Sequence, residues 1–247
     1  MSDPDRPPDL RSLAERRAIT SRADFESLIG QRTPDVDKDD LILQLCDGRS
    51  VLDLGCIDHS AETALALGDR WLHRRISAVA DSVVGLDMLG DDAAELNQLG
   101  YDIMVADAAS FDLGRTFDVV VAGDLIEHLS NIGHFLECID RHVTFDSVIV
   151  VTTPNPFNVE QITQAIFNHR TMVNTEHVVQ IDPRAMFETV RRSPLEIIDF
   201  RWVDTRFHFE LTGGRVARRV VNPLTRALMR RRPLIRRDYA VVLRRRR

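Results

Sequence analysis

Acidic residues stand at the ends of several short apolar runs in this chain, where a carboxylate can meet a bound ligand. Asp53 and Gly55 end one run, Asp87 ends the next, and Asp107 with Ala108 ends a third. Gly55 lets a ligand approach the backbone, and the N-terminus of a following helix favours an anionic group. Asp87 can accept both hydroxyls of a ribose, and Asp107 with adjacent amides can bind an adenine edge. Three such acids on successive runs predict a nucleotide-like ligand.

A second group of chemically active residues follows the next apolar run. If Asp124-Leu125-Ile126-Glu127-His128 enters a helix, then Asp124, Glu127 and His128 share one face. Two carboxylates and an imidazole suit either a divalent cation or general-base catalysis on a hydroxyl. His177 is a further candidate for the same site. The alternative is that Glu127 and His128 only pin a helix while Asp124 faces the cleft, and we favour a metal-free site.

The elements that must position these residues alternate regularly along the chain. Nearly continuous apolar runs, typical of buried strands, occupy 50–55, 82–87, 102–107, 117–123 and 147–153. The intervening segments, including 61–80, 91–99 and 131–142, suit helices. Segments 196–204 and 238–243 predict two further strands. Strands that alternate with helices imply a doubly wound, mostly parallel α/β sheet, whose ligands bind at the carboxyl ends of the strands.

These motifs together resemble the class I S-adenosylmethionine (SAM)-dependent methyltransferases, over roughly residues 45–205. The resemblance rests on VLDLGC at 51–56, VVGLD at 83–87, VADAASFDL at 105–113, FDVVVAGDLIEHL at 117–129 and VVTTPNPF at 150–157. It implies a Rossmann-like sheet of seven strands with a reversed last strand, and SAM as the cofactor. The cofactor contacts that it implies are Asp53, Gly55, Cys56, Asp87, Met88, Asp107, Ala108 and Asp124.

Two features depart from this family's pattern. Ile57 and His59 stand where the first motif usually has further glycines, which would narrow or reshape the cofactor loop. The gap between Asp53 and Asp87 is also longer than usual, and we expect the extra residues to extend the first helix.

The expected reaction is methylation of a hydroxyl. Amine-methylating members often carry an Asn/Asp-Pro-Pro-Tyr/Phe motif after the fourth strand, and this chain lacks it there. An alcohol or phenol needs a base, for which His128, His177 and Glu127 are the candidates. We expect a small or lipid-linked acceptor of the sugar, quinone or polyketide type. The alternatives are a metal-dependent RNA 2′-O-methyltransferase, with Asp124, Glu127, His128 and His177 as ligands, and a non-catalytic scaffold with this fold.

Composition sets the remaining expectations. The 247 residues suit an N-terminal extension (1–40), with a helix within Leu13–Ile29 covering one edge, and a methyltransferase domain (41–247). Three scattered cysteines and no signal peptide indicate the cytoplasm. The net charge of −6 is uneven, because 13 arginines and one acid follow Leu211. This basic insertion (about 211–237) can hold an amphipathic helix that contacts an anionic membrane. Nucleic acid is the less favoured partner, because Tyr239 is the tail's only aromatic residue.

Overall fold

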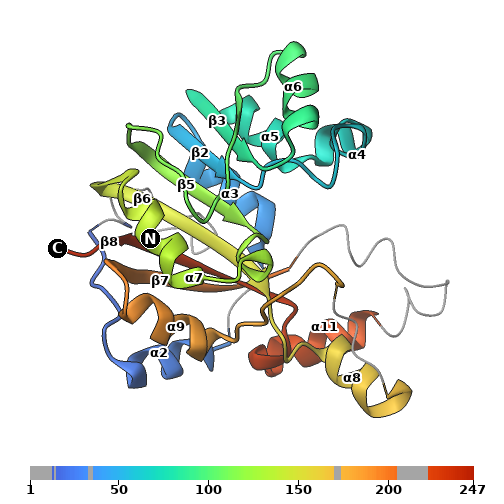
Figure 1. Ribbon diagram of the computed structural model, residues 1–247. Helices are drawn as coiled ribbons and strands as arrows, with labels where there is room; N and C mark the ends of the chain where they lie inside the picture. The colour runs from blue at the N-terminus through green and yellow to red at the C-terminus, as the bar shows by residue number, and fades with distance from the viewer. Residues whose placement is uncertain (1–12, 14, 33–35, 170–173, 205–221) are drawn as a thin grey trace.

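An eight-stranded sheet in the order β1-β7-β8-β6-β5-β2-β3-β4 forms the centre of the protein (Figure 1). The computed structural model describes residues 13, 15–32, 36–169, 174–204 and 222–247. Among the strands that the structure describes, only β8 runs antiparallel to its neighbours, β6 and β7. The mostly parallel sheet with a reversed last strand confirms the predicted fold class.

The strands are apolar runs bounded by polar residues. This pattern is expected because parallel strands covered on both faces are buried along their length. Strands β3 (Ser82–Asp87) and β5 (Phe117–Gly123) have the predicted bounds. The others are β1 (Val36–Asp37), β2 (Ser50–Leu54), β4 (Ile103–Val105), β6 (Val143–Pro154), β7 (Leu195–Asp204) and β8 (Asp238–Arg245).

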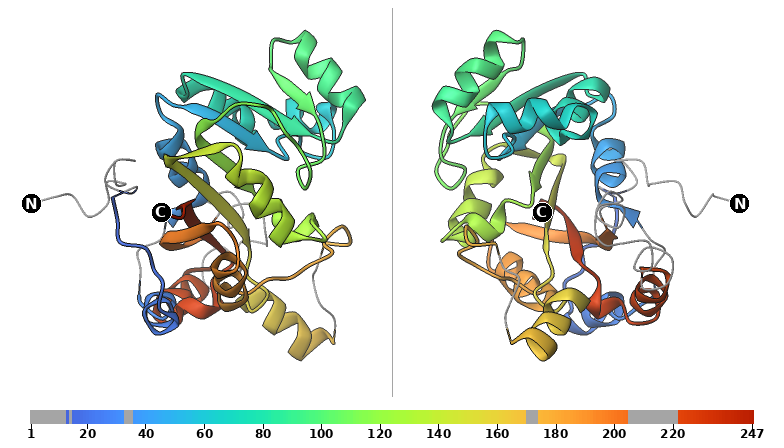
Figure 2. Two further views of the ribbon diagram at one scale, coloured as in Figure 1. Left: turned by 60° about the vertical axis from the view of Figure 1, so that its left-hand side comes forward. Right: turned by 90° about the vertical axis from the view of Figure 1, so that its right-hand side faces the viewer.

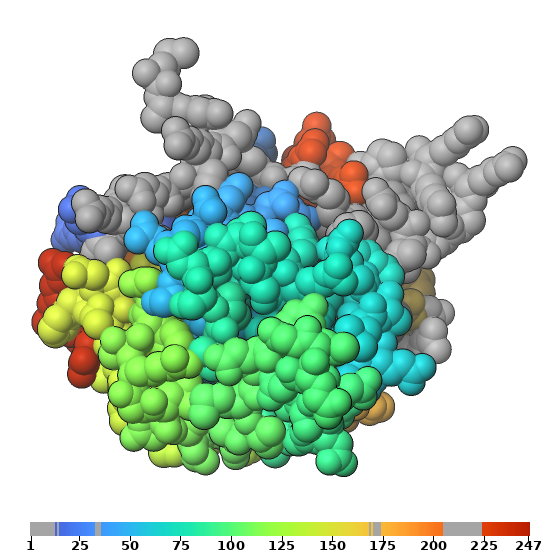
Figure 3. All heavy atoms as spheres, turned by 90° about the horizontal axis from the view of Figure 1, so that it is seen from above, coloured from blue at the N-terminus to red at the C-terminus, as the bar shows by residue number. Residues whose placement is uncertain are grey.

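Helices cover both faces of this sheet, which gives three layers (Figure 2). Helices α2 (Arg22–Ile29), α7 (Ile132–Asp140) and α9 (Pro183–Arg191) pack into one large apolar cluster. On the other face, α3 (Lys38–Cys46) and α5 (Leu72–Val79) pack into a second cluster. A third cluster lies under α4 (Ala61–Leu67) and α6 (Gly90–Gln98). Figure 3 views the protein from above, and the cyan to green region that contains α4 and α6 forms much of the surface on this side.

The structure corrects four expectations. The sheet has eight strands rather than seven, because Val36 and Asp37 of the predicted polar connection pair with β7. The long gap after Asp53 forms α4, a 3₁₀ turn at Gly68–Arg70 and the separate helix α5, not one extended helix. Within Leu13–Ile29 the structure describes helix α2 at Arg22–Ile29, which packs on α9 and so covers a face rather than an edge.

The fourth correction is that DLIEHL does not enter an α-helix. Its Ile126–His128 segment is a single 3₁₀ turn, η2.

The basic C-terminal region contains helix α11 (Asn222–Arg231) and a 3₁₀ turn, η4 (Pro233–Ile235), before β8. The preceding part of the predicted basic insertion, residues 211–221, lies outside the described residues. Among the helices that the structure describes, none is long and apolar enough to cross a membrane.

Candidate functional site

The first loop of the site connects β2 to α4 and is tied to the end of β3. The Asp87 carboxylate accepts hydrogen bonds from the backbone amides of Ile57 (2.9 Å) and Leu89 (3.2 Å). Gly55 has a φ of +68°, a conformation that favours glycine, and a Cβ there would meet the Leu125 side chain at 2.9 Å. A carboxylate can accept about four hydrogen bonds, so Asp87 keeps capacity for ribose hydroxyls while it holds the loop.

The two residues that replace the family's glycines differ in where their side chains lie. Ile57 is 6% exposed and packs in the apolar cluster under α4 and α6, so its side chain points into the protein. His59 takes a left-handed φ of +59°, the conformation for which glycine is usually selected. Its exposed ring lies 3.6 Å from the Glu176 carboxylate. The Ile57 side chain is therefore directed away from solvent, whereas the His59 ring extends from the loop toward Glu176.

Other predicted cofactor residues differ in what their side chains contact. The Asp53 carboxylate is buried and lies 2.8 Å from His73 Nδ1 of α5, so the inserted helix is anchored to β2. The Cys56 side chain is also buried and packs closely on Gly85. Met88 is 69% exposed at the end of β3, a position open to a planar ligand. In the third loop, Asp107 accepts from the Ala109 amide at 2.8 Å and Ala108 is buried.

Asp124 ends β5 and is held by two partners. Lys38 at the start of α3 donates to Asp124 Oδ2, and the Thr152 hydroxyl donates to Oδ1 at 2.8 Å. The backbone of Asp124 has a φ of +49°, which is uncommon outside glycine. Burial alone would raise the pKa of Asp124, but Lys38 and Thr152 hold it below its ordinary value. Asp124 is therefore an ionised, fixed group at the carboxyl end of the sheet.

Lys38 is a residue of this site that the sequence did not identify, as are His73 and Thr152. It is the only lysine beside 31 arginines. Its side chain is only 12% exposed. Burial opposes its charge, but Asp124 and Asp238 together raise its pKa above the ordinary value. A compact ammonium suits this space better than a planar guanidinium. The single lysine was the available signal, although its partner could not be read from it.

Replacing Lys38 with methionine should destabilise the protein and weaken its activity together, because Asp124, whose side chain is 38% exposed, would keep its charge without its partner. Breaking a fully buried pair from one side typically costs about 3–5 kcal/mol, and we expect a smaller cost here because solvent screens the partly exposed Asp124. The double variant Lys38→Met/Asp124→Asn should recover much of the lost stability. Chemical denaturation of the wild type, both single variants and the double variant measures this coupling. Additive effects of the two substitutions would contradict the ion pair's proposed importance.

The predicted catalytic residues Glu127, His128 and His177 come together on the neighbouring turn. Their ligand atoms all lie within 4.8 Å of one another, and the two imidazole rings pack edge to face with centroids 4.8 Å apart. The carbonyl oxygen of Glu127 accepts from the amides of Val178 (2.9 Å) and Val179 (3.1 Å). These backbone bonds dock the segment that carries His177 against η2. Asp124 does not join this group, because its carboxylate is turned to Lys38 and Thr152.

The surroundings of this cluster shift the pKa values of Glu127 and His177. The Glu127 side chain is buried, its Oε2 accepts from Thr153 at 2.9 Å, and its Oε1 has no hydrogen-bond partner among the described residues. Burial, and then the nearby charge of Asp124, raise the pKa of Glu127 to about 7. Burial and the neighbouring His128 lower the pKa of His177. A carboxyl that titrates near neutrality and a histidine that stays uncharged are both suited to accept a proton.

Comparison with known proteins supports the resemblance that the motifs indicated. No family model matches the chain. A curated (S)-tetrahydroprotoberberine N-methyltransferase from Eschscholzia californica is 26% identical over 126 residues, which is 51% of this chain and 33% of the relative. A pavine N-methyltransferase from Thalictrum flavum subsp. glaucum is 31% identical over 94 residues, 38% of this chain and 26% of the relative. The matched region thus spans about a third or less of these relatives.

Solved structures share the fold over most of the chain. A SAM-dependent methyltransferase from Archaeoglobus fulgidus has a TM-score of 0.50 at 16% identity, covering 84% of this chain and 94% of the other. Magnesium protoporphyrin IX methyltransferase from Synechocystis PCC 6803, solved with bound SAH, has a TM-score of 0.51 at 13% identity, covering 84% and 81%. This likeness establishes the fold, and together with the curated relatives it confirms the resemblance to the superfamily.

Proposed function

We propose that this chain, whose fold is that of the class I SAM-dependent methyltransferases, transfers a methyl group from SAM to a small acceptor. The observation that carries the proposal is that two groups of residues lie together at the carboxyl ends of the parallel strands. The Gly55 and Asp87 loops lie at the ends of β2 and β3, and the Glu127–His128–His177 cluster follows β5. These strands are parallel neighbours, so cofactor loops and proton acceptors share the edge at which such folds bind ligands.

The residues present fit the cofactor. Asp87 would hold the ribose, Met88 would flank the adenine, Asp107 with Ala108 would bind its amino edge, and the Gly55–Cys56 backbone would lie beside the methionine part. The inward orientation of Ile57 supports this assignment over a non-catalytic scaffold. SAM supplies an electrophilic methyl group on a sulfonium. The chain's own contribution is to orient the acceptor in line with that methyl and to receive the acceptor's proton.

The acceptor atom that we favour is a hydroxyl oxygen, as the sequence indicates. The Glu127–His128–His177 cluster can deprotonate an alcohol or phenol, which has a greater need of a base than a neutral amine has. An amine nitrogen is the second candidate, because the curated relatives are named as N-methyltransferases of plant alkaloids. The same cluster would then remove a proton from an ammonium group.

Calorimetry with SAM and with S-adenosylhomocysteine tests the proposal at its first step. We expect saturable binding of both at micromolar to millimolar concentration. Absence of heat with either at millimolar concentration would refute the enzyme. The second step is methyl transfer from labelled SAM to matched phenol, sugar and secondary-amine acceptors, which separates oxygen from nitrogen methylation.

EDTA should leave the activity within about twofold of its untreated value. The Glu127–His128–His177 cluster offers three ligand atoms, but the fourth predicted ligand, Asp124, is ion-paired with Lys38. The Lys38 ammonium adds a positive charge beside Asp124, which disfavours a cation there. Activity is measured before and after dialysis against EDTA, with a zinc enzyme as the chelation control. A loss that Mg²⁺ or Mn²⁺ reverses would instead favour a metal-dependent site.

A further inference from the structure

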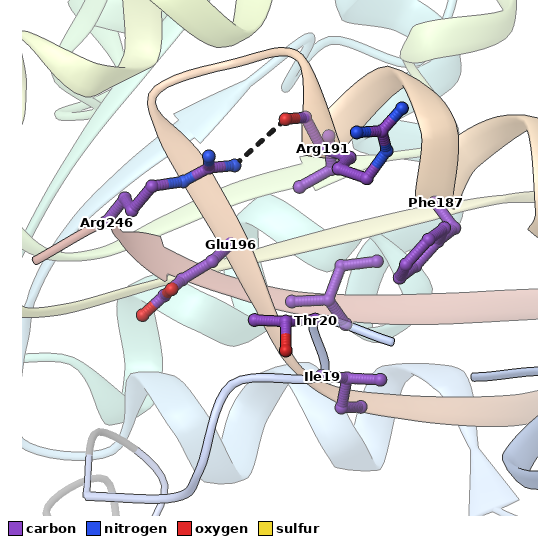
Figure 4. Close-up of a pocket in the computed structure, with 8 residues that line it drawn as sticks. Ile19, Thr20, Phe187, Arg191, Glu196 and Arg246 are labelled. Carbon is purple, nitrogen blue, oxygen red and sulfur yellow. Dashed lines mark hydrogen bonds between the residues drawn. The ribbon is translucent and has the colours of Figure 1, made fainter. Parts of the chain in front are cut away.

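A cavity lies at the amino ends of the parallel strands, opposite the proposed active site at their carboxyl ends. Its volume is about 310 Å³, near the lower end for small-molecule sites. It is bounded by the N-terminal segment, the end of α9, the start of β7 and the residue that follows β8 (Figure 4). Because β7 begins where β2, β3 and β5 also begin, this cavity is separated from Asp87 and Glu127 by the length of the strands.

Four apolar side chains line this cavity: Ile19 is partly exposed at its side, and Phe187, Val190 and Ile197, each 1–3% exposed, form its buried floor. The Ile19 amide donates to the carbonyl of Ile197 at 2.8 Å, which fixes the N-terminal segment along β7. Phe187 is 3% exposed, and its ring stacks on Phe25 with centroids 4.9 Å apart. The walls are therefore held by packing and a backbone hydrogen bond, so the cavity is formed before any ligand enters.

The charged side chains at the cavity differ in whether they have an ion-pair partner. Glu196 is neutralised by Arg244, whose Nε lies 2.8 Å from the carboxylate, and Arg191 pairs with Glu188 at 3.0 Å. Arg246 instead donates through Nη2 to the carbonyl oxygens of Arg191 (3.1 Å) and Leu195 (3.0 Å). Within the described part of the chain, no acidic residue forms an ion pair with Arg246. Its guanidinium is thus held in place while its charge is not neutralised by a carboxylate.

We propose that this cavity binds a small amphiphilic carboxylate, with the carboxylate on Arg246 and a short apolar body against Phe187, Val190 and Ile197. A guanidinium forms charge-assisted hydrogen bonds to a carboxylate in a fixed geometry, and apolar walls of this kind bury an aliphatic or small aromatic body. The positive charge of Arg246 would repel a cationic amphiphile. A neutral amphiphile would form no charge-assisted hydrogen bond with the Arg246 guanidinium. The ligand is distinct from the methyl acceptor, because the two sites lie at opposite ends of the sheet.

Calorimetry with octanoate, octanol and octylammonium as probes tests this site on the full chain. We expect octanoate to bind at least tenfold more tightly than either other probe. The affinity should be unchanged when the protein is saturated with S-adenosylhomocysteine. Octanoate affinity no greater than that of octanol, or competition between octanoate and S-adenosylhomocysteine, would overturn the proposal.

Three variants assign the binding to this cavity. Arg246→Gln should weaken octanoate binding at least tenfold and leave octanol binding unchanged. Arg192→Gln, on an arginine at the end of α9 that does not line the cavity, should leave both unchanged. Thr20→Phe, at an exposed cavity position, should fill the space and weaken both probes without changing Arg246. Wild-type octanoate affinity in Arg246→Gln and Thr20→Phe would overturn the proposal even if one variant were poorly folded.

Discussion

Replacing Asp87 with alanine should raise the dissociation constant for SAM at least 100-fold. The carboxylate is predicted to accept both ribose hydroxyls, and hydrogen bonds to a charged group contribute about 1.5–3 kcal/mol each. The substitution also removes the acceptor for the Ile57 and Leu89 amides, which are held at 2.9 and 3.2 Å. The loop would then be less well ordered for the cofactor. Calorimetric titration of SAM into both proteins measures the change.

Asp92→Ala is the matched control for this experiment. Asp92 also accepts a hydrogen bond from a backbone amide of the same region, that of Ala61 at 2.8 Å, but it is not predicted to touch the cofactor. Its loss should therefore cost stability and change SAM affinity by less than fivefold. Equal SAM affinities in Asp87→Ala and Asp92→Ala would contradict the assignment of Asp87 to the ribose.

The sequence predicted the parallel strands well because each is buried on both faces. A buried parallel strand must be apolar throughout, and polar residues must bound it, so the runs at 82–87 and 117–123 give the bounds of β3 and β5 directly. Strand β1 escaped notice because a two-residue strand has no periodicity. Its position depends on pairing with the end of β7, a contact that local sequence does not contain.

The sequence also predicted some residues of the candidate site but not the contacts between distant ones. Glu127 and His128 are adjacent in sequence, and their chemical types predicted a site with His177 that the structure brings together. Asp124 was placed with them on the assumption of an α-helix, but its left-handed backbone and the following 3₁₀ turn direct it elsewhere. Lys38 is 86 residues from Asp124, and His73 is 20 from Asp53. Such pairs follow from the tertiary fold, so residue types alone could not show them.

Replacing Glu127 with glutamine should lower methyl transfer at least 100-fold and also change how activity depends on pH. General-base catalysis contributes about 10²–10⁴ to a rate. With a pKa of about 7, the wild-type carboxylate is mostly protonated at pH 6 and mostly ionised at pH 8. Wild-type turnover should therefore be about tenfold lower at pH 6 than at pH 8. Glutamine cannot ionise, so the residual activity of Glu127→Gln should lose this acidic limb.

The stability of Glu127→Gln at pH 8 should rise although its activity falls. The folded protein holds the Glu127 proton more tightly than an unfolded chain does, because the pKa is about 7 rather than 4.5. Wild-type stability from this group is full below pH 4.5 and is lost as the pH rises to about 7. Glutamine avoids that loss. We therefore expect Glu127→Gln to melt at a higher temperature than the wild type at pH 8, and at a similar temperature at pH 5.

Glu95→Gln makes the same chemical change on the exposed side of α6 and should alter neither activity nor melting temperature. The paired readout separates a base from a merely structural group. If Glu127 only pinned the η2 turn through Thr153, its substitution would lower stability and activity together at every pH. A variant that is more stable at pH 8 yet nearly inactive requires the ionised carboxylate to act in the reaction. Such a result would mean that the folded protein keeps Glu127 buried, at a cost in stability above pH 7, in return for its role as proton acceptor.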